Sequence, residues 1–363
     1  MRNNKIQVLP DEIGELKCLQ VLDLAFNSLE TIDPVATCYS LKTLDMQNNQ
    51  ITELPANIGN LTNLTRIGLR YNQLTHLPLS LGMCTKLDEL NLESNNLTDI
   101  PDGFFDGLVK IVTLILSRNK FTQIPAKVSQ LSALKRLAID NNMLKTMNVE
   151  PLLGLRRLGK LDISENKIRE LPGDIDQLAQ LREFCAARNH LRSLPESICR
   201  AHNVTILKLN NNDIQELPQN IGNLTNLIHL DMEGNSLKQI PPTMGALVQL
   251  KYLSLQSNEI EYLPNTLRTL VELSSLYIGE NGLLALPPCI GDLRSLHTLH
   301  INDNELNTIP VELGLCESLE LLNVEGNPFE ELPAHVVEGG PPGIVAYCRS
   351  QCITPSNWWE GGV

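Results

Sequence analysis

The chain has 363 residues, a net charge of −13, only 4% aromatic residues and nine cysteines. An acidic protein is a poor partner for nucleic acid or an anionic membrane, because phosphate binding requires a basic surface. The cysteines are odd in number and scattered, the opening "MRNNKIQVLP" has no apolar signal core, and no run approaches membrane-spanning length, so we expect a cytoplasmic protein, with the nucleus as an alternative.

An asparagine recurs from end to end of the chain at steps of 22 to 24 residues. Proline follows six residues later in thirteen of the fifteen units, and aliphatic residues stand three and five positions before it. The positions are Asn4, Asn27, Asn49, Asn72, Asn95, Asn119, Asn142, Asn166, Asn189, Asn212, Asn235, Asn258, Asn281, Asn304 and Asn327. This period and consensus predict an α/β leucine-rich-repeat solenoid, horseshoe-shaped, with about 15 repeats and the first one partial.

Each repeat predicts one short strand and one return segment. In "RIGLRYN" (66–72), Ile67 and Leu69 alternate with polar residues or glycine, which is typical of a strand with one buried face. The strands are expected to form a parallel sheet on the concave side, and "LPxxIGxL" to return through turns or short helices. The asparagine amide is expected to satisfy backbone groups where the strand ends, once per coil.

The fixed period leaves no internal domain boundary, so we expect one repeat array over residues 1–335. The segment 336–352 predicts a capping helix with Ile344, Val345 and Cys348 on one face, and residues 353–363 predict a flexible tail. No P-loop, dinucleotide fingerprint, zinc spacing or nucleophile elbow occurs. The sequence therefore predicts neither an enzyme nor a cofactor or metal site.

Function is expected on the concave face, at the positions six, four and two before each asparagine. Charges of both signs occupy these positions in the first half, and tyrosines and histidines form a diagonal across four repeats in the second half, where tyrosines are favoured interface anchors. The candidate partner-binding residues are Asp23, Asp45, Arg66, Arg70, Glu89, Glu93, Ile115, Arg136, Asp140, Lys160, His229, Glu233, Tyr252, Tyr277 and His300.

Other interpretations of these positions stay open. Any single polar residue on a solvated strand could be incidental, and Ile115 with Ala138 is either a small docking patch or scattered apolar exposure. Cys185 also stands at an outward strand position, where an incidental small residue is favoured over a reactive thiol.

The segments "IGLRYNQLTHLPLSLGMCTKLDELNLESNNLTDIP" (67–101), "NNKIQVLPDEIGEL" and "LPAHVVEGGPPGIVAYC" resemble the suppressor-of-Clear family of Ras-binding leucine-rich-repeat scaffolds. The register fits up to about residue 350, and the longer units around "PDGFFDGLVKIVTL" and the "VVEGGPPGIV" cap carry most of the likeness.

This resemblance implies a non-catalytic scaffold in the pathway from Ras to the mitogen-activated kinases. Such a scaffold binds a GTP-bound Ras-family GTPase and the catalytic subunit of type-1 protein phosphatase, which then dephosphorylates Raf kinases. The family also carries an N-terminal segment with a phosphatase-docking motif and further repeats, and we expect this region to be absent because the chain begins inside a repeat at Met1. The alternative is a generic intracellular adaptor, of the plant Ras-group or polarity-scaffold kind, with other protein partners.

Overall fold

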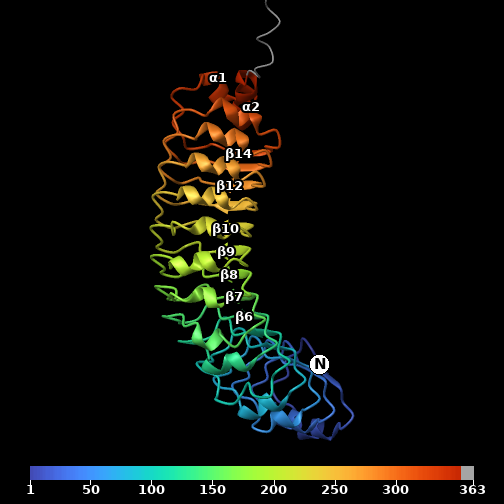
Figure 1. Ribbon diagram of the computed structural model, residues 1–363. Helices are drawn as coiled ribbons and strands as arrows, with labels where there is room; N and C mark the ends of the chain where they lie inside the picture. The colour runs from blue at the N-terminus through green and yellow to red at the C-terminus, as the bar shows by residue number, and fades with distance from the viewer. Residues whose placement is uncertain (353–363) are drawn as a thin grey trace, which may run out of the picture. The chain divides into compact units, whose positions relative to one another are not determined.

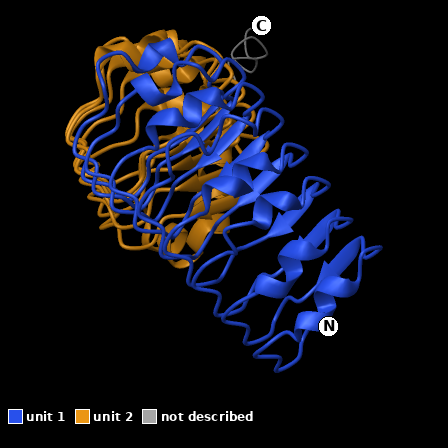
Figure 2. Cartoon of the chain, turned by 90° about the horizontal axis from the view of Figure 1, so that it is seen from below, with its two compact units in different colours: residues 1–190 blue, residues 191–363 orange. Residues whose placement is uncertain are grey.

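The computed structural model describes residues 1–352 and confirms the leucine-rich-repeat solenoid (Figure 1). Two compact units divide the chain, unit 1 from Met1 to His190 and unit 2 from Leu191 onward, which are blue and orange in Figure 2. The tail that the sequence predicts at 353–363 lies outside the described residues.

Each coil contributes one strand of three residues. In unit 1 the strands are β1 Val21–Asp23, β2 Thr43–Asp45, β3 Arg66–Gly68, β4 Glu89–Asn91, β5 Thr113–Ile115, β6 Arg136–Ala138, β7 Lys160–Asp162 and β8 Glu183–Cys185. In unit 2 they are β9 Ile206–Lys208, β10 His229–Asp231, β11 Tyr252–Ser254, β12 Ser275–Tyr277, β13 Thr298–His300 and β14 Leu321–Asn323. Within each unit, successive strands pair in parallel in chain order. Asn4 stands too early in the chain for a strand to precede it, which accounts for fourteen strands beside fifteen asparagines.

The strand register stacks leucine on leucine. Leu22 pairs with Leu44, and Leu253 pairs with Leu276. The middle residue of each strand is buried, and its two neighbours point to the opposite side because side chains alternate along a strand. We call that opposite side the strand face.

A short 3₁₀ helix lies in almost every return segment. These helices are η1 Asp11–Glu15, η2 Asp33–Thr37, η3 Ile58–Asn60, η4 Leu79–Met83, η5 Ala126–Gln130, η6 Glu150–Leu152, η7 Ile175–Gln177, η8 Glu196–Arg200, η9 Ile221–Asn223, η10 Pro242–Ala246, η11 Asn265–Thr269, η12 Pro288–Asp292 and η13 Val311–Leu315. Strands contact strands and these helices contact helices of the next coil, so the two form separate layers with the leucine core between them. The consensus proline commonly sits just before the helix, as Pro78 does before η4, where its missing N–H is not needed.

The asparagine ladder has the predicted structural role. Asn142 Nδ2 donates to the carbonyl oxygens of Leu116 at 3.0 Å and Ile139 at 3.1 Å, and its Oδ1 accepts from the backbone N–H of Phe121 at 3.0 Å. Bonds of this kind recur from Asn27 onward and tie successive coils together, whereas Asn4 donates only within its own coil, to Met1 O and Arg2 O.

The C-terminal cap consists of two helices, α1 Ala334–Glu338 and α2 Gly340–Gln351. Helix α2 packs against η13 and buries Ile344 and Cys348 as expected, whereas Val345 is only half-buried. The break between the helices falls at Gly340, whose φ of +62° favours glycine, and Pro341 and Pro342 follow in the first turn of α2. No helix within residues 1–352 is long and apolar enough to cross a membrane.

Candidate functional site

All fifteen candidate residues stand next to buried aliphatic residues or Met232 and so belong to the strand face, ten of them in unit 1 and five in unit 2. In unit 1 this face is hollowed around Gly68, where a cavity of about 440 Å³ is lined by Asp23, Asp45, Arg66, Arg70 and Glu89, among others. The hollow exists because Gly68 has no side chain, and a methyl group there would overlap Asp45 Oδ1. The sequence marked these charged residues but not the glycine between them.

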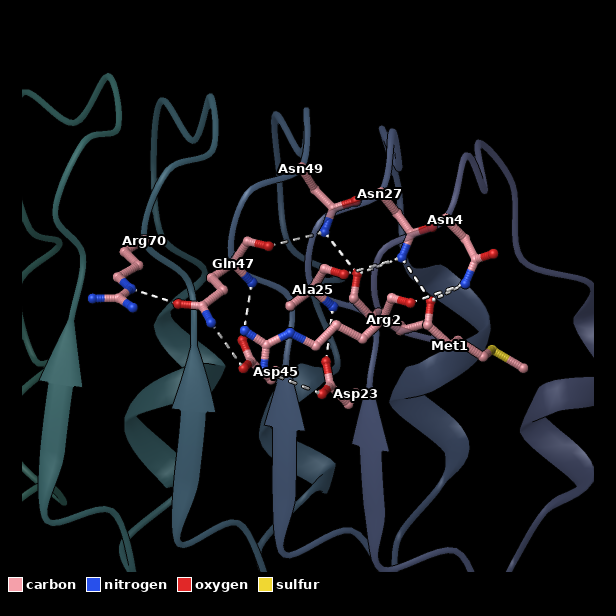
Figure 3. Close-up of polar contacts among 11 residues, drawn as sticks. Met1, Arg2, Asn4, Asp23, Ala25, Asn27, Asp45, Gln47, Asn49 and Arg70 are labelled. Carbon is pink, nitrogen blue, oxygen red and sulfur yellow. Dashed lines mark hydrogen bonds and ion pairs between the residues drawn. The ribbon is translucent and has the colours of Figure 1, made fainter.

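The charges around this hollow are joined by a glutamine (Figure 3). Gln47 Nε2 donates to Asp45 Oδ2 at 3.2 Å, the Gln47 backbone N–H donates to Asp45 Oδ1 at 3.1 Å, and Arg70 Nε donates to Gln47 Oε1. Asp23 Oδ2 lies 4.0 Å from Arg2 Nη1. Gln47 stands two residues before Asn49, at a strand-face position, so the spacing could have found it. The candidates chosen at such positions were charged, aromatic or aliphatic, and no amide was among them.

Further along unit 1, the predicted acids and bases pair across neighbouring coils. Glu93 Oε1 lies 3.9 Å from Arg118 Nε and accepts from Tyr71 Oη at 3.3 Å. Lys160 forms an ion pair with Glu183. Sequence reasoning named one partner of each pair and missed the other, although Glu183 stands opposite Lys160 in the strand register.

The Asp140 carboxyl group is half-buried on the strand face of unit 1. Burial raises the pKa of its carboxyl group, a hydrogen bond from the Ser117 hydroxyl lowers it, and the charge of Asp162 raises it again. The hydrogen bond from Ser117 therefore replaces only part of the hydration that the Asp140 carboxylate loses on burial.

The remaining candidates of unit 1 differ in exposure. Arg66, Glu89 and Arg136 are exposed, and within residues 1–352 the two arginines form no ion pair. Ile115 is half-buried and pairs in register with Ala138, which is only 2% exposed. Ala138 is thus covered by its longer neighbours, and an apolar patch at this place would consist of Ile115 alone.

In unit 2 the predicted diagonal is a continuous chain of rings. The His229 and Tyr252 rings stack with centroids 4.1 Å apart and planes 1° apart, Tyr252 and Tyr277 are 5.3 Å apart, and Tyr277 and His300 meet edge to face at 4.8 Å. Strand register produces this arrangement, because His229 pairs with Tyr252 and Tyr277 pairs with His300. Neighbouring rings on adjacent strands restrict one another, which presents them as a pre-ordered surface.

Acidic residues lie beside this chain of rings. Burial raises the pKa of Asp231 and of Glu233, and the charges of Asp231 and Glu280 raise the pKa of Glu233 further. Burial lowers the pKa of His229, with Lys208 adding to the effect, and burial also lowers the pKa of His300. Neutral imidazoles and partly desolvated carboxylates therefore share this face.

The leucine rich repeat family model matches residues 85–144, 132–191 and 202–260, and a two-copy leucine rich repeats model matches 18–60 and 39–79. A leucine-rich-repeat protein of Leptospira interrogans is 35% identical, with a TM-score of 0.85 over 90% of this chain and 83% of that one. The chain belongs to the leucine-rich repeat family.

Other solved structures are similar at lower identity. The leucine-rich-repeat ectodomain of the Arabidopsis receptor kinase HAESA, in complex with an IDA peptide hormone ligand, is 26% identical, with a TM-score of 0.68 over 90% of this chain and 57% of that one. YopM from Yersinia enterocolitica is also 26% identical, with a TM-score of 0.62 over 90% of this chain and 63% of that one. The search of curated proteins found no match. The leucine-rich-repeat fold is typically a non-enzymatic protein-interaction domain, and members of this family bind other proteins.

Proposed function

We propose that this protein is a non-catalytic cytoplasmic scaffold whose strand face binds a GTP-bound Ras-family GTPase and the catalytic subunit of type-1 protein phosphatase. Raf kinase is then an indirect partner, because the phosphatase held on the scaffold removes its inhibitory phosphate and promotes mitogen-activated kinase signalling.

The ordered side chains of the strand face support the scaffold function. This face presents ordered side chains in both units: in unit 1 the charges of Asp45 and Arg70, bridged by Gln47 beside Gly68, and in unit 2 the chain of rings from His229 to His300. Aromatic residues that are already ordered lose little entropy on binding and are favoured interface anchors. The choice of partners is supported by the resemblance to the suppressor-of-Clear family at residues 67–101 and at the "VVEGGPPGIV" cap.

The test is capture of purified phosphatase and Ras-family GTPase by the immobilised chain, with the GTPase loaded with either GDP or a non-hydrolysable GTP analogue. We expect both proteins to be retained, the GTPase only in its GTP-like state. The double variant Tyr252→Ala/Tyr277→Ala is expected to weaken retention, since truncating each interface tyrosine costs about 1–2 kcal/mol. The exposed pair Tyr39→Ala/Tyr262→Ala, away from the strand face, is the matched control. Retention of neither protein by the wild-type chain would refute this choice of partners.

A generic protein adaptor with other partners is the second candidate. It is favoured by the family comparisons, because the models match the repeat consensus that adaptors of many kinds share. Affinity purification with mass spectrometry separates the two functions by whether the phosphatase and a Ras-family GTPase are recovered together.

A further inference from the structure

The C-terminal cap leaves a groove open at the end of unit 2. Helix α2 packs against η13 through Ile344 and Cys348 and lies at the end of the array, next to β14 (Figure 1). A cavity of about 540 Å³ lies between α2 and the segment that enters β14, and we call it the cap groove. Its apolar lining residues are Leu319, Leu322, Pro341, Pro342, Val345 and Ala346. A volume of this size has room for more than one small side chain, because sites for small molecules begin at about 300 Å³.

One stripe of α2 is apolar without being buried. Pro342 and Ala346 are exposed and Val345 is half-buried, and residues three or four apart share one face of a helix. The ends of a repeat array are ordinarily closed by a capping unit with a polar outer face. The cap of this chain lacks such a face over the groove, so a segment that covers the stripe would remove apolar surface from water.

Two charged side chains border the groove and favour an indole as its occupant. Arg349 is exposed in the last turn of α2, where its Nη2 donates to Glu317 O at 3.5 Å. Glu320 is exposed on the other side, and within residues 1–352 it belongs to no ion pair. A guanidinium is attracted to the face of an indole, and a carboxylate accepts from the indole N–H. Apolar walls, one cation and one acceptor together match the chemistry of tryptophan.

The chain itself supplies tryptophan close to this groove. It has two tryptophans in all, and both, Trp358 and Trp359, stand in the eleven residues that follow Cys352. Cys352 Sγ donates to Val311 O at 3.0 Å, which holds the start of this segment against η13. Six residues separate Trp358 from Cys352 and reach about 20 Å when extended, whereas α2 spans only about 12 Å from Arg349 back to Pro341. The segment is therefore long enough to return along α2 to the groove.

We propose that residues 353–363 fold back over the cap groove of their own chain and bind Trp358 and Trp359 in it. The indole rings cover the apolar stripe of α2 beside Arg349, and the polar residues Ser356, Asn357 and Glu360 supply the outer face that the end of the array lacks. A docked segment takes the place of the flexible tail expected from sequence alone. The proposal does not depend on the partners proposed for the strand face.

Intrinsic tryptophan fluorescence of the full chain tests this proposal, because no tryptophan outside the segment contributes to it. The reference is a free peptide of residues 353–363. We expect the chain to emit at shorter wavelength than the peptide and to be quenched by acrylamide at least about threefold more weakly, which corresponds to rings that are docked about two-thirds of the time or more. Emission and quenching equal to those of the peptide would overturn the proposal and leave the groove to an external partner.

Two variants locate the rings in the groove. Ala346→Glu places a carboxylate on the apolar stripe, and we expect it to raise acrylamide quenching toward that of the peptide. Gln351→Glu adds the same charge at an exposed position of α2 that does not line the groove, and we expect it to behave as wild type. Glu320→Lys changes the groove from outside α2 and is also expected to increase quenching, with the exposed Glu338→Lys as its control.

The remaining outcomes each decide against the proposal. Tryptophans that stay protected in both Ala346→Glu and Glu320→Lys would be bound elsewhere, and the groove would be refuted. Protection that is lost on dilution of the wild-type chain would mean that the segment binds a second copy instead of its own groove. The comparison of the wild-type chain with the peptide does not depend on the folding of any variant.

Discussion

A single asparagine in each coil connects backbone groups of two coils, so its loss is expected to lower stability without selecting among partners. Asn235 Nδ2 donates to Leu209 O at 3.1 Å and Met232 O at 2.9 Å, and Oδ1 accepts from Ile214 N at 3.0 Å. Asn235→Ala leaves these buried groups unpaired, which should cost about 1–3 kcal/mol in the free energy of unfolding. Chemical denaturation measures this, with the exposed Asn307→Ala as control. Equal stability of the two variants would contradict the ladder role.

The residue directly before each ladder asparagine has a positive φ, from Asn3 to Gly326. Only two of these fifteen residues, Gly234 and Gly326, are glycines. The sequence pattern did not reveal this constraint because asparagine, serine, arginine, glutamate, aspartate and aromatic residues all occur there. A polar or unbranched residue tolerates the left-handed region at moderate cost, whereas a β-branched residue does not.

This conformation predicts opposite effects of two substitutions at Ser257, whose φ is +54°. Both Ser257→Val and Ser257→Gly remove the hydroxyl that donates to Glu280, so their difference reports the backbone alone. We expect the valine variant to be less stable than the glycine variant by about 1–2 kcal/mol. Thermal or chemical unfolding measures the difference, and a valine variant as stable as the glycine variant would show that φ is not the constraint.

At the scale of the element, a consensus glycine permits the return helices to pack closely. A Cβ on Gly222 in η9 would overlap the carbonyl oxygen of Thr243 in η10. Gly314 in η13 faces the backbone of α2 in the same way, with Arg349 N at 2.6 Å and Cys348 C at 2.7 Å from an added Cβ. These contacts are with backbone atoms, which cannot rotate away.

Gly314→Ala is therefore expected to displace α2 from the last coil. The predicted result is faster amide hydrogen exchange in α2 and a lower melting temperature, since Ile344 and Cys348 lose part of their burial. Gly173→Ala is the matched control, because nothing lies within 4 Å of an added Cβ there. Unchanged exchange in α2 would indicate that the helix can shift without cost.

The sequence predicted the elements better than the contacts between them. Period and alternation place the strands, the ladder asparagines and the diagonal from His229 to His300, because each depends on spacing alone. Short helices in the return segments were also expected. The left-handed residue and the bridging Gln47 depend on how adjacent coils approach one another, which one repeat does not encode. The same holds for the close packing of the Asn302 amide over Gly279 of the preceding coil.

At the scale of the whole molecule, carboxylates whose pKa is raised by burial make the stability of the fold depend on pH. Burial raises the pKa of Asp140 above an unfolded value of about 3.9. The folded chain then binds the proton more tightly, so stability is lost as pH rises from about 3.9 through the folded pKa. Asp140→Asn, which can still accept from Ser117, is expected to gain melting temperature relative to wild type as pH rises from 3.5 to 7. The exposed Asp102→Asn is the control. If the difference in melting temperature between Asp140→Asn and wild type did not change with pH, the raised pKa of Asp140 would be contradicted.

The histidines of the ring chain are expected to act in the opposite direction. Burial lowers the pKa of His229 and of His300, and the charge of Lys208 lowers that of His229 further. Histidines of the unfolded chain titrate at about 6.5, so near this pH the folded chain binds fewer protons than the unfolded chain. The stability contributed by the neutral rings is complete above that value and is lost as pH falls from about 6.5 toward the folded pKa values. Burial raises the pKa of Asp231 and of Glu233, so their protonation at lower pH changes stability in the opposite direction. The informative quantity is therefore the difference in melting temperature between variant and wild type. We expect the wild-type melting temperature to fall more steeply between pH 7.5 and 5.5 than that of His229→Gln/His300→Gln, with exposed His76→Gln following wild type. Parallel curves for the double variant and wild type would mean that protonation of these rings does not disturb the chain of rings.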